Sequence, residues 1–314
     1  MKQGRFRHLV LAGIVAAGCA MAEPVEPKAE LATKMGELLV HGRQYLDQDE
    51  ADRAKSHFDE ARRLAESLDD VPGTVQAFNG LGASAAQKGA LNEAMEWHRR
   101  ALVLAEGQKR PDLTADSLAH LGTAYHLAGR TDEAGPLYQR ALKLVKESGD
   151  AHREAVLLNN LGLIDLRAGH MAAAEEAFAR ALAANRELDD RRAQAANLAN
   201  LGLVAEQQDR WDEAQAKFEA ALALDKAGEQ RPGIAADLAG LARVAQKQNR
   251  KDEALAYAQR AYWAYRALGD YPKALIELNR AVGLAQDQGR RDEAAQLEAE
   301  RRSLPQAPSS ATRP

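Results

Sequence analysis

The sequence is poor in cysteine and in aromatic residues. Cys19 is the only cysteine among 314 residues, so no disulfide can form within the chain. Aromatic residues account for 5% of the sequence, although hydrophobic residues account for 46%. A core with so few large rings has to be built from small aliphatic side chains. This composition favours helices packed closely on helices and argues against a sheet.

Motifs that identify common enzymes are also missing. The chain has no glycine-rich phosphate loop, no paired cysteines at metal-ligand spacing and no serine nucleophile motif. Its histidines are scattered, and His120 and His126 lie six residues apart, which places them on different faces of one helix. We therefore predict that the protein is not an enzyme and that it uses no metal and no cofactor.

A large excess of charge of one sign is lacking as well. The net charge is −4 at pH 7. Proteins that bind nucleic acid by neutralising phosphates carry clustered basic residues and a positive balance. We therefore predict that nucleic acid is not a partner.

What the sequence does contain is a repeat of forty residues. A leucine followed by a small residue recurs at this period, in the pairs Leu81-Gly82, Leu121-Gly122, Leu161-Gly162, Leu201-Gly202 and Leu241-Ala242. A column of alanines runs beside it at Ala54, Ala94, Ala134, Ala174, Ala214, Ala254 and Ala294. A fixed period in this range indicates a stacked array of structural repeats.

Each repeat has the pattern of two helices. In the unit that begins at Ala155, Leu158, Leu161 and Gly162 share one helical face. The first helix should end at a residue that tolerates a left-handed conformation, at Asp49, Gly89, Gly129, Gly169, Asp209, Asn249 and Gly289. Acidic pairs open the second helix and complement its dipole, at Asp132-Glu133, Asp212-Glu213, Asp252-Glu253 and Asp292-Glu293.

The columns also predict how the helices pack. Glycine inside a helix costs about 1 kcal/mol relative to alanine, so the glycine of the Leu-Gly pair must serve packing. Without a side chain it lets the next helix approach closely. The second helix is expected to bury the alanine column and a bulky column at Phe58, His98, Tyr138, Phe178 and Phe218.

Residues 1–22 have the pattern of a secretory signal peptide. Three basic residues precede a short apolar stretch over residues 9–17, which is too short for a stable membrane span. Two cleavage sites compete. Residues 16–19 resemble a bacterial lipobox, in which Cys19 would be lipidated and become the mature N-terminus. Alternatively, cleavage after Ala22 would release a soluble periplasmic protein.

The remaining boundaries follow from proline content and from the repeat. Residues 23–30 are predicted to be a tether and residues 305–314 a disordered tail. The array should cover residues 31–304, with units starting near residues 35, 75, 115, 155, 195, 235 and 275. A lipidated Cys19 followed by Ala20 favours the outer membrane, facing the periplasm, since Ala20 is not the aspartate of an inner-membrane retention signal.

These columns resemble the tetratricopeptide repeat. The positions that carry the resemblance are Leu118, Leu121, Gly122, Tyr125, Ala134, Tyr138 and Ala141. The usual period is about 34 residues, and the longer period here is similar to that of kinesin light chains. The resemblance implies an all-α fold, a right-handed α-solenoid of about seven helix-turn-helix repeats. It also implies a protein or peptide partner, with membrane contact only through the possible N-terminal lipid.

In this family the first helices of the repeats line a concave groove that holds a peptide. Carried over by position, the groove residues are Asn79, Asp116, His126, Asn159, Asn160, Leu163, Leu166, Asn200, Leu203, Arg243, Gln246 and Asn279. The asparagines can both donate and accept hydrogen bonds, as a peptide backbone requires. The leucines would form an apolar strip. Alternatively, the leucines only seal one repeat against the next.

Two functions are compatible with this pattern. The first is a non-catalytic interaction scaffold of the bacterial cell envelope, for example in the assembly of a pilus or a secretion apparatus. The second is a regulatory subunit of an envelope enzyme complex, such as cell-wall synthesis or hydrolysis machinery. A cytoplasmic regulator would require that residues 1–22 are not a signal peptide.

Overall fold

The computed structural model describes residues 27–304, and fourteen α-helices account for almost all of them. The helices are α1 (Pro27–Asp47), α2 (Ala51–Ser67), α3 (Val71–Gln87), α4 (Leu91–Gly107), α5 (Pro111–Leu127), α6 (Thr131–Ser148), α7 (Ala151–Ala168), α8 (Met171–Glu187), α9 (Arg191–Gln207), α10 (Trp211–Ala227), α11 (Arg231–Lys247), α12 (Lys251–Ala267), α13 (Tyr271–Asp287) and α14 (Arg291–Ser303). The predicted signal peptide, Cys19 and the predicted tail lie outside the described residues. Helix α1 begins at Pro27, within the segment predicted to be a tether.

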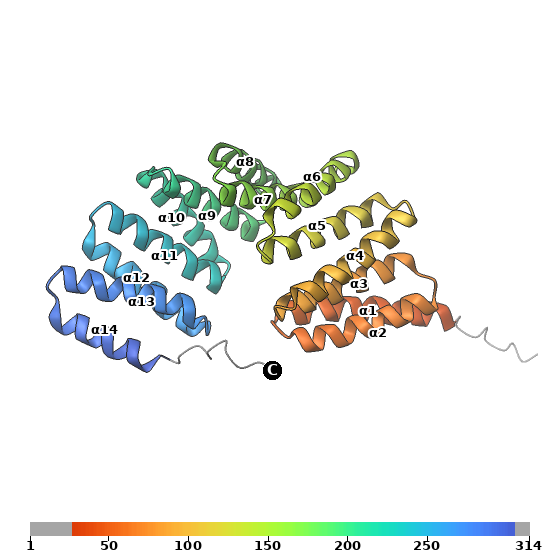
Figure 1. Ribbon diagram of the computed structural model, residues 1–314, viewed down its shortest axis with the longest axis horizontal. Coiled ribbons are helices and arrows are strands. Elements are labelled where there is room, and N and C mark those ends of the chain that lie inside the picture. The colour runs from red at the N-terminus through yellow and green to blue at the C-terminus, as the bar shows by residue number, and fades with distance from the viewer. Residues whose placement is uncertain (1–26, 305–314) are drawn as a thin grey trace, which may run out of the picture.

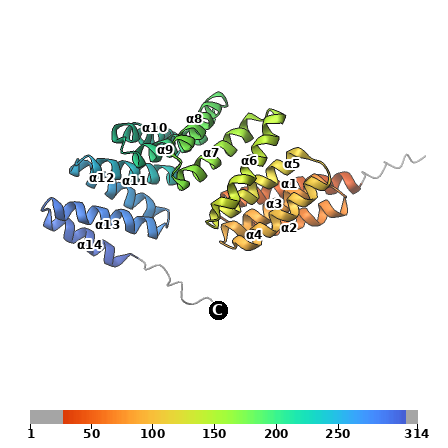
Figure 2. The ribbon, with the colours of Figure 1, turned by 45° about the horizontal axis from the view of Figure 1, so that its top comes forward.

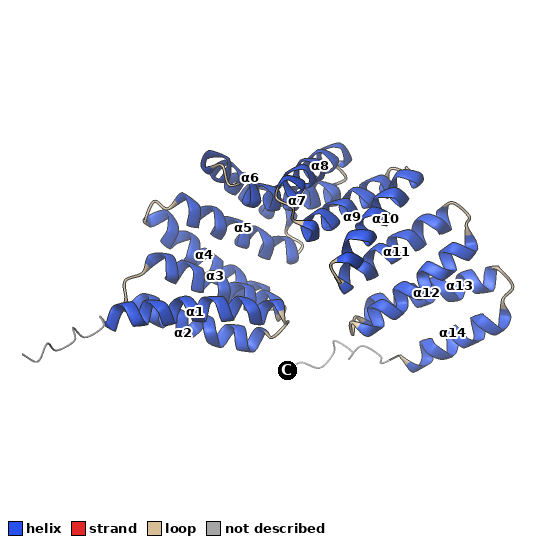
Figure 3. Ribbon diagram, turned by 180° about the vertical axis from the view of Figure 1, so that it is seen from behind, coloured by secondary structure: helices blue, strands red, loops and turns tan. Residues whose placement is uncertain are grey.

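The helices pack in chain order as seven antiparallel pairs, which confirms the prediction of an all-α solenoid of about seven repeats. The array bends into an arch, with α1 and α2 at one end and α13 and α14 at the other (Figure 1). The same arrangement is visible when the arch is tilted (Figure 2). Seen from behind, the connections between helices are short turns throughout (Figure 3).

The two helices of a repeat have different places in the arch. From α1 to α11, each odd-numbered helix contacts the next odd-numbered helix as well as its own partner. Within residues 27–304, successive even-numbered helices do not contact each other to a comparable extent. The odd-numbered helices therefore form the inner row of the arch, and the even-numbered helices are splayed along its outside.

Both kinds of turn use a left-handed residue. The turn after each odd-numbered helix has a positive φ at the seven positions that the sequence indicated, for example 80° at Gly169. The turn after each even-numbered helix from α2 to α12 also has a residue with positive φ, including 53° at Lys109, where a side chain is strained. Aspartates then cap several odd-numbered helices, as Asp150 does by accepting a hydrogen bond from the Arg153 backbone N–H.

The glycine column and the bulky column meet inside each of the first five repeats. A Cβ atom placed on Gly162 would lie only 2.7 Å from Cε1 of Phe178, and Phe178 is fully buried. The same contact joins Gly122 to Tyr138 and Gly202 to Phe218. The alanine column is buried as predicted, with Ala174 and other members completely inaccessible. The aromatic ring thus occupies the space that a helix side chain would otherwise fill.

Candidate functional site

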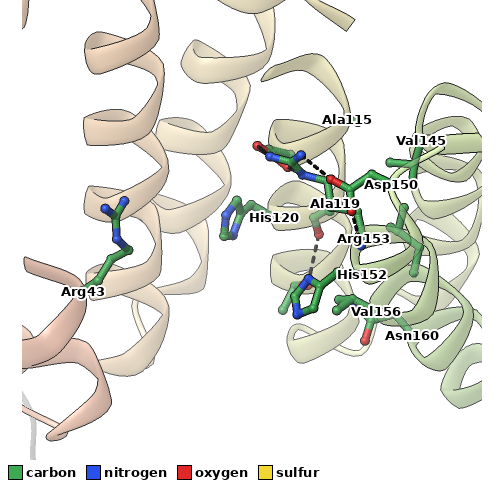
Figure 4. A pocket seen from close by; sticks show the side chains of 13 residues that line it. Arg43, Ala115, Ala119, His120, Val145, Asp150, His152, Arg153, Val156 and Asn160 are labelled. Carbon is green, nitrogen blue, oxygen red and sulfur yellow. Dashed lines mark hydrogen bonds and ion pairs between the residues drawn. The ribbon is translucent and has the colours of Figure 1, made fainter. Parts of the chain in front are cut away.

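Two overlapping cavities lie on the inner side of the N-terminal half of the arch. One, of about 650 Å³, is enclosed by α1, α5, α6 and α7 (Figure 4). A second, of about 430 Å³, shares four of its lining residues with the first and extends it over α3 and α2. The shared residues are Arg43, Asp116, His120 and Arg153. The two cavities therefore form one continuous groove, which we call the inner groove.

Arg153 forms ion pairs with two aspartates in the wall of the inner groove. Its guanidinium donates two hydrogen bonds to Asp116, at 2.7 and 3.0 Å, and a third to Asp150 at 2.6 Å. The hydrogen bond from the Arg153 backbone, followed by that from its guanidinium, holds the pKa of Asp150 below its usual range. This cluster ties α5 to α7 and fixes the orientation of the wall of the groove.

Other polar groups of the inner groove are free to meet a ligand. Arg43 reaches in from α1 and faces the side chains of α5 and α7 (Figure 4). Among residues 27–304 it has no carboxylate within ion-pair distance, and no hydrogen bond between protein groups engages the side chains of His152 or Asn160. Val156, an exposed apolar residue, lies between them on α7. The groove thus combines unused hydrogen-bonding groups with an accessible apolar surface.

A buried histidine supports the floor of the groove. His98 packs against Gly82 and stacks on the exposed His120, with ring centroids 5.3 Å apart. Its Nδ1 lies 3.2 Å from Oδ1 of Asn79, and the Asn79 amide donates to Ser117 Oγ. Burial, and then the neighbouring His120, lower the pKa of His98 to about 3. His98 is therefore neutral at physiological pH and acts as part of the core.

The predicted asparagines form a network between helices. Oδ1 of Asn159 accepts hydrogen bonds from Asn197 and Asn200, both at 2.9 Å. Asn197 is buried and also accepts from Asn185 at 2.7 Å. Asn159 and Asn200 therefore bond to each other across α7 and α9, whereas Asn160 lines the inner groove.

The predicted leucines pack between repeats. Leu166 is buried in the core between α7 and α10, and Leu163 and Leu203 are half-buried against the same core. Their contacts are those expected of side chains that seal one repeat against the next. Because Leu163 and Leu203 are only partly buried, they also leave some apolar surface on the inner row.

The remaining predicted residues are spread along the array and do not converge. Arg243 donates two hydrogen bonds to Glu206, at 2.6 and 2.8 Å, and Gln246 accepts one from Arg280 at 2.6 Å. Asn279 accepts a long hydrogen bond from Arg301 near the C-terminal end. His126 is half-buried, and burial lowers its pKa.

Several residues of the inner groove were not predicted from the sequence, although two of them occupy the same repeat positions as predicted groove residues. Arg43 occupies the same position of its repeat as Leu163, Leu203 and Arg243. His120 occupies the position of Asn160 and Asn200. Arg153 and His152 lie in the first turn of α7, outside the columns that were carried over. Extending each column to every repeat would have identified Arg43 and His120.

Two further properties bear on the chemistry of the described residues. Over residues 27–304, no three histidine, cysteine, aspartate or glutamate side chains are grouped as a metal ion would require. None of the helices in this range has the length and the apolar content of a membrane span.

Comparison with known families identifies the repeat. Two models described as Tetratricopeptide repeat match residues 39–112, and residues 113–187 and 192–262. Together these ranges cover more than half of the chain. The chain belongs to the tetratricopeptide repeat family.

A curated relative matches part of this tetratricopeptide repeat protein. Protein FLUORESCENT IN BLUE LIGHT, chloroplastic, from Arabidopsis thaliana is 30% identical over 102 residues, which is 32% of this chain and 31% of that protein. The match thus spans about a third of that curated relative.

Solved structures share the fold at low sequence identity. Aspartyl phosphate phosphatase F from Bacillus subtilis is 13% identical, with a TM-score of 0.66 over 92% of this chain and 75% of that one. A putative kinesin light chain from Podospora anserina with nearly identical repeats is 15% identical, with a TM-score of 0.50 over 66% of this chain and 100% of that one. Tetratricopeptide repeats like those of kinesin light chains are thus among the structural neighbours, as the forty-residue period predicted.

Proposed function

We propose that the protein is a non-catalytic scaffold that binds a segment of a partner protein in the inner groove. Tetratricopeptide repeat domains bind protein or peptide partners, and the inner groove is where this chain offers suitable groups. The observation that carries the proposal is the combination of Arg43, His152, Asn160 and Val156 on facing walls of one groove. A peptide presents backbone donors and acceptors together with apolar side chains, and such a wall can accommodate both.

The location of the groove refines the site predicted from the sequence. The cavities lie along α1 to α7, whereas five of the twelve predicted residues lie on α9 to α13. On the C-terminal half, the arginines that reach the inner row are already paired, as Arg243 is with Glu206 and Arg280 is with Glu277. Freeing those groups for a ligand would first break existing hydrogen bonds, so the N-terminal half is the better peptide site.

Placing a charge in the groove should abolish binding without unfolding the array. Val156 is 45% exposed on the inner row and Val103 is 69% exposed on the outer helix α4, so aspartate is tolerated by the fold at either position. We expect Val156→Asp to weaken partner binding at least about tenfold, because a carboxylate buried under a ligand loses its hydration. Val103→Asp should leave affinity unchanged.

A photo-crosslinking residue at position 156 or 103 of the full chain would identify the partner needed for this measurement. Crosslinks formed from position 156 and absent from position 103 support the inner groove. Equal crosslinking from the two positions, or equal affinity of the two aspartate variants, would instead place the partner elsewhere on the surface.

We further propose that the scaffold acts in the bacterial cell envelope, anchored to the outer membrane through a lipid on Cys19. The proposal is supported by the basic and apolar pattern of residues 1–22 and by the position of the only cysteine. Cleavage after Ala22, which gives a soluble periplasmic protein, is the alternative. A regulatory subunit of an envelope enzyme complex would use the same groove, and the identity of the crosslinked partner decides between the two functions.

The anchor can be tested by membrane fractionation. We expect the unmodified sequence to fractionate with the outer membrane, and Cys19→Ser to move the protein to the soluble fraction or to block its processing. Ala20→Ser is a control that keeps the cysteine. A mature protein that starts at Glu23 and is wholly soluble in the periplasm would rule out the lipid anchor.

A further inference from the structure

Two buried aspartates lie close enough for their charges to interact at the junction of the fifth and sixth repeats. Asp225 lies near the end of α10 and Asp237 lies in the first half of α11, and both are buried. Neither carboxylate oxygen of Asp237 has a hydrogen-bond partner, although only 1% of the residue is exposed. Asp225 fills the space above Gly233, where a Cβ atom would lie 1.7 Å from its Oδ2. Buried carboxylates without partners are rare because their desolvation is costly.

The preceding junction shows what these positions normally do. Forty residues earlier, Asn185 and Asn197 occupy the places of Asp225 and Asp237, and the Asn185 amide donates to Asn197. Asn197 also donates to Asn159, but the equivalent of Asn159 at the next junction is an alanine, Ala199. The aspartate junction has therefore lost both donors and gained two acceptors. Asp225 and Asp237 can therefore form a hydrogen bond with each other only when one of the two carboxylates is protonated and donates its O–H.

Charged and titratable groups surround the pair from every helix that packs against α11. Arg192 on α9 acts on Asp225 and favours its ionised form. Tyr265 on α12 lies within the electrostatic reach of Asp237, Arg243 and Glu277, the last of these on α13. Arg243 is held by Glu206, and Glu277 by Arg280. Arg243 and Arg280 are thus paired with carboxylates of their own, and the charge of Arg192 acts on Asp225, so none of these three cations forms an ion pair with Asp237.

We propose that the junction of α10 and α11 is a pH-responsive joint, closed while the pair Asp225 and Asp237 holds a proton and loosened when that proton is lost. With the proton, one carboxylic acid can donate to the other carboxylate, as Asn185 donates to Asn197. Without it, two adjacent negative charges are buried with no donor. The repulsion weakens the packing between repeats five and six, and this packing couples α11–α14 to the rest of the array.

The sign of the pH dependence follows from the same burial. Desolvation, and then the charge of Asp225, raise the pKa of Asp237 from 3.8 to about 8, and desolvation also raises the pKa of Asp225. Between these two values the folded joint binds a proton that the opened joint releases. The stability of the joint is therefore full below about pH 4 and falls as the pH rises to about 8, with opening increased by up to about tenfold per pH unit.

Hydrogen exchange of the full chain tests the joint directly. We compare protection factors of amides in α10 and α11 at pH 5.5 and pH 7.5, after correction for intrinsic exchange. The wild type should show opening at this junction increased by about ten- to a hundredfold at the higher pH. Amides of α3 and α4 should change far less, since they lie in repeats that do not contact the pair.

Two amide variants supply the missing donor and separate the pair from other titrating groups. Asp237→Asn reproduces Asn197, and Asp225→Asn reproduces Asn185, so either should abolish most of the pH dependence while the array stays folded. Glu219→Gln, at an exposed position of α10, is the matched control and should retain it. A wild type with equal protection at the two pH values, or amide variants that keep the full wild-type dependence, would overturn the proposal.

Tryptophan fluorescence gives a second measurement on the same variants. Trp211 begins α10 and Trp263 lies in α12, on either side of the joint, and Trp97→Phe removes the third tryptophan. At pH 7.5 we expect these reporters to show a melting transition below that of the remaining helices, and at pH 5.5 a single transition. Coincident transitions at both pH values would also contradict the joint. None of these outcomes depends on the groove that we propose for the partner.

Discussion

Replacing Phe178 with alanine should destabilise the array by about 3–5 kcal/mol. The ring is fully buried and lies against Gly162 of the same repeat, so truncation leaves a cavity between α7 and α8. The surrounding helices are held by neighbouring repeats and can collapse into that cavity only in part. Chemical denaturation followed by circular dichroism measures the loss.

The sixth repeat shows how the loss can be offset. There Ala242 and Ala258 take the places of the glycine and the aromatic residue, and both are completely buried. Gly162→Ala alone should cost about 1–3 kcal/mol through overpacking. Combined with Phe178→Ala it should cost less than the sum, with a coupling of about 1–2 kcal/mol, because the new methyl group fills part of the cavity. Gly122→Ala faces Tyr138 and should add to Phe178→Ala without coupling, and equal coupling for both glycines would show that the contact has been misassigned.

Replacing Asn197 with leucine should cost about 2–4 kcal/mol. The substitution removes the acceptor of Asn185 and one of the two donors to Asn159, and the buried Asn185 amide is left unsatisfied. The loss is larger than that of one exposed hydrogen bond because the groups cannot turn to water. Thermal and denaturant unfolding of the single variant measure it.

The preceding junction provides the control for this prediction. Val145 and Leu157 occupy the same two positions one repeat earlier, and both are buried without polar groups. The double variant with Asn185→Val and Asn197→Leu reproduces that apolar pair and should recover most of the stability, since both partners are replaced together. A double variant as unstable as the sum of the two single variants would mean that the network does not act as a unit.

The repeat made most of the fold predictable. The left-handed residues recur at a fixed distance, so a position such as Asn249 was identified as a turn although its local sequence, Asn249-Arg250-Lys251, is only polar. Gly162 was expected to allow close approach of a helix, and the ring that fills the space is that of the bulky column. Local propensity and long-range packing agree at these positions, which is why one sequence sufficed.

The candidate site was less predictable because it depends on the curvature of the array. The forty-residue period predicts which residues occupy equivalent helix faces in the repeats. It does not predict which of these faces come close together when distant repeats curve towards each other. Arg43 and Arg153 are separated by more than a hundred residues and line the same cavity because the arch brings α1 opposite α7. The bonds of Asn159 depend on a neighbour, Asn197, which lies outside the columns used to predict the groove.

The constant length of the repeat also limits how the chain can change. Each of the first six units has a left-handed residue at both of its turns, the seventh has one at Gly289, and all of them keep the same forty-residue spacing. Removing one residue from a helix would rotate everything after it by about 100° and move the alanine column off the core face. Removing forty residues would restore every column to its place. Insertions and deletions in this array are therefore tolerated in whole units, so its length changes in steps of one helix pair, and the reach of its inner row changes with it.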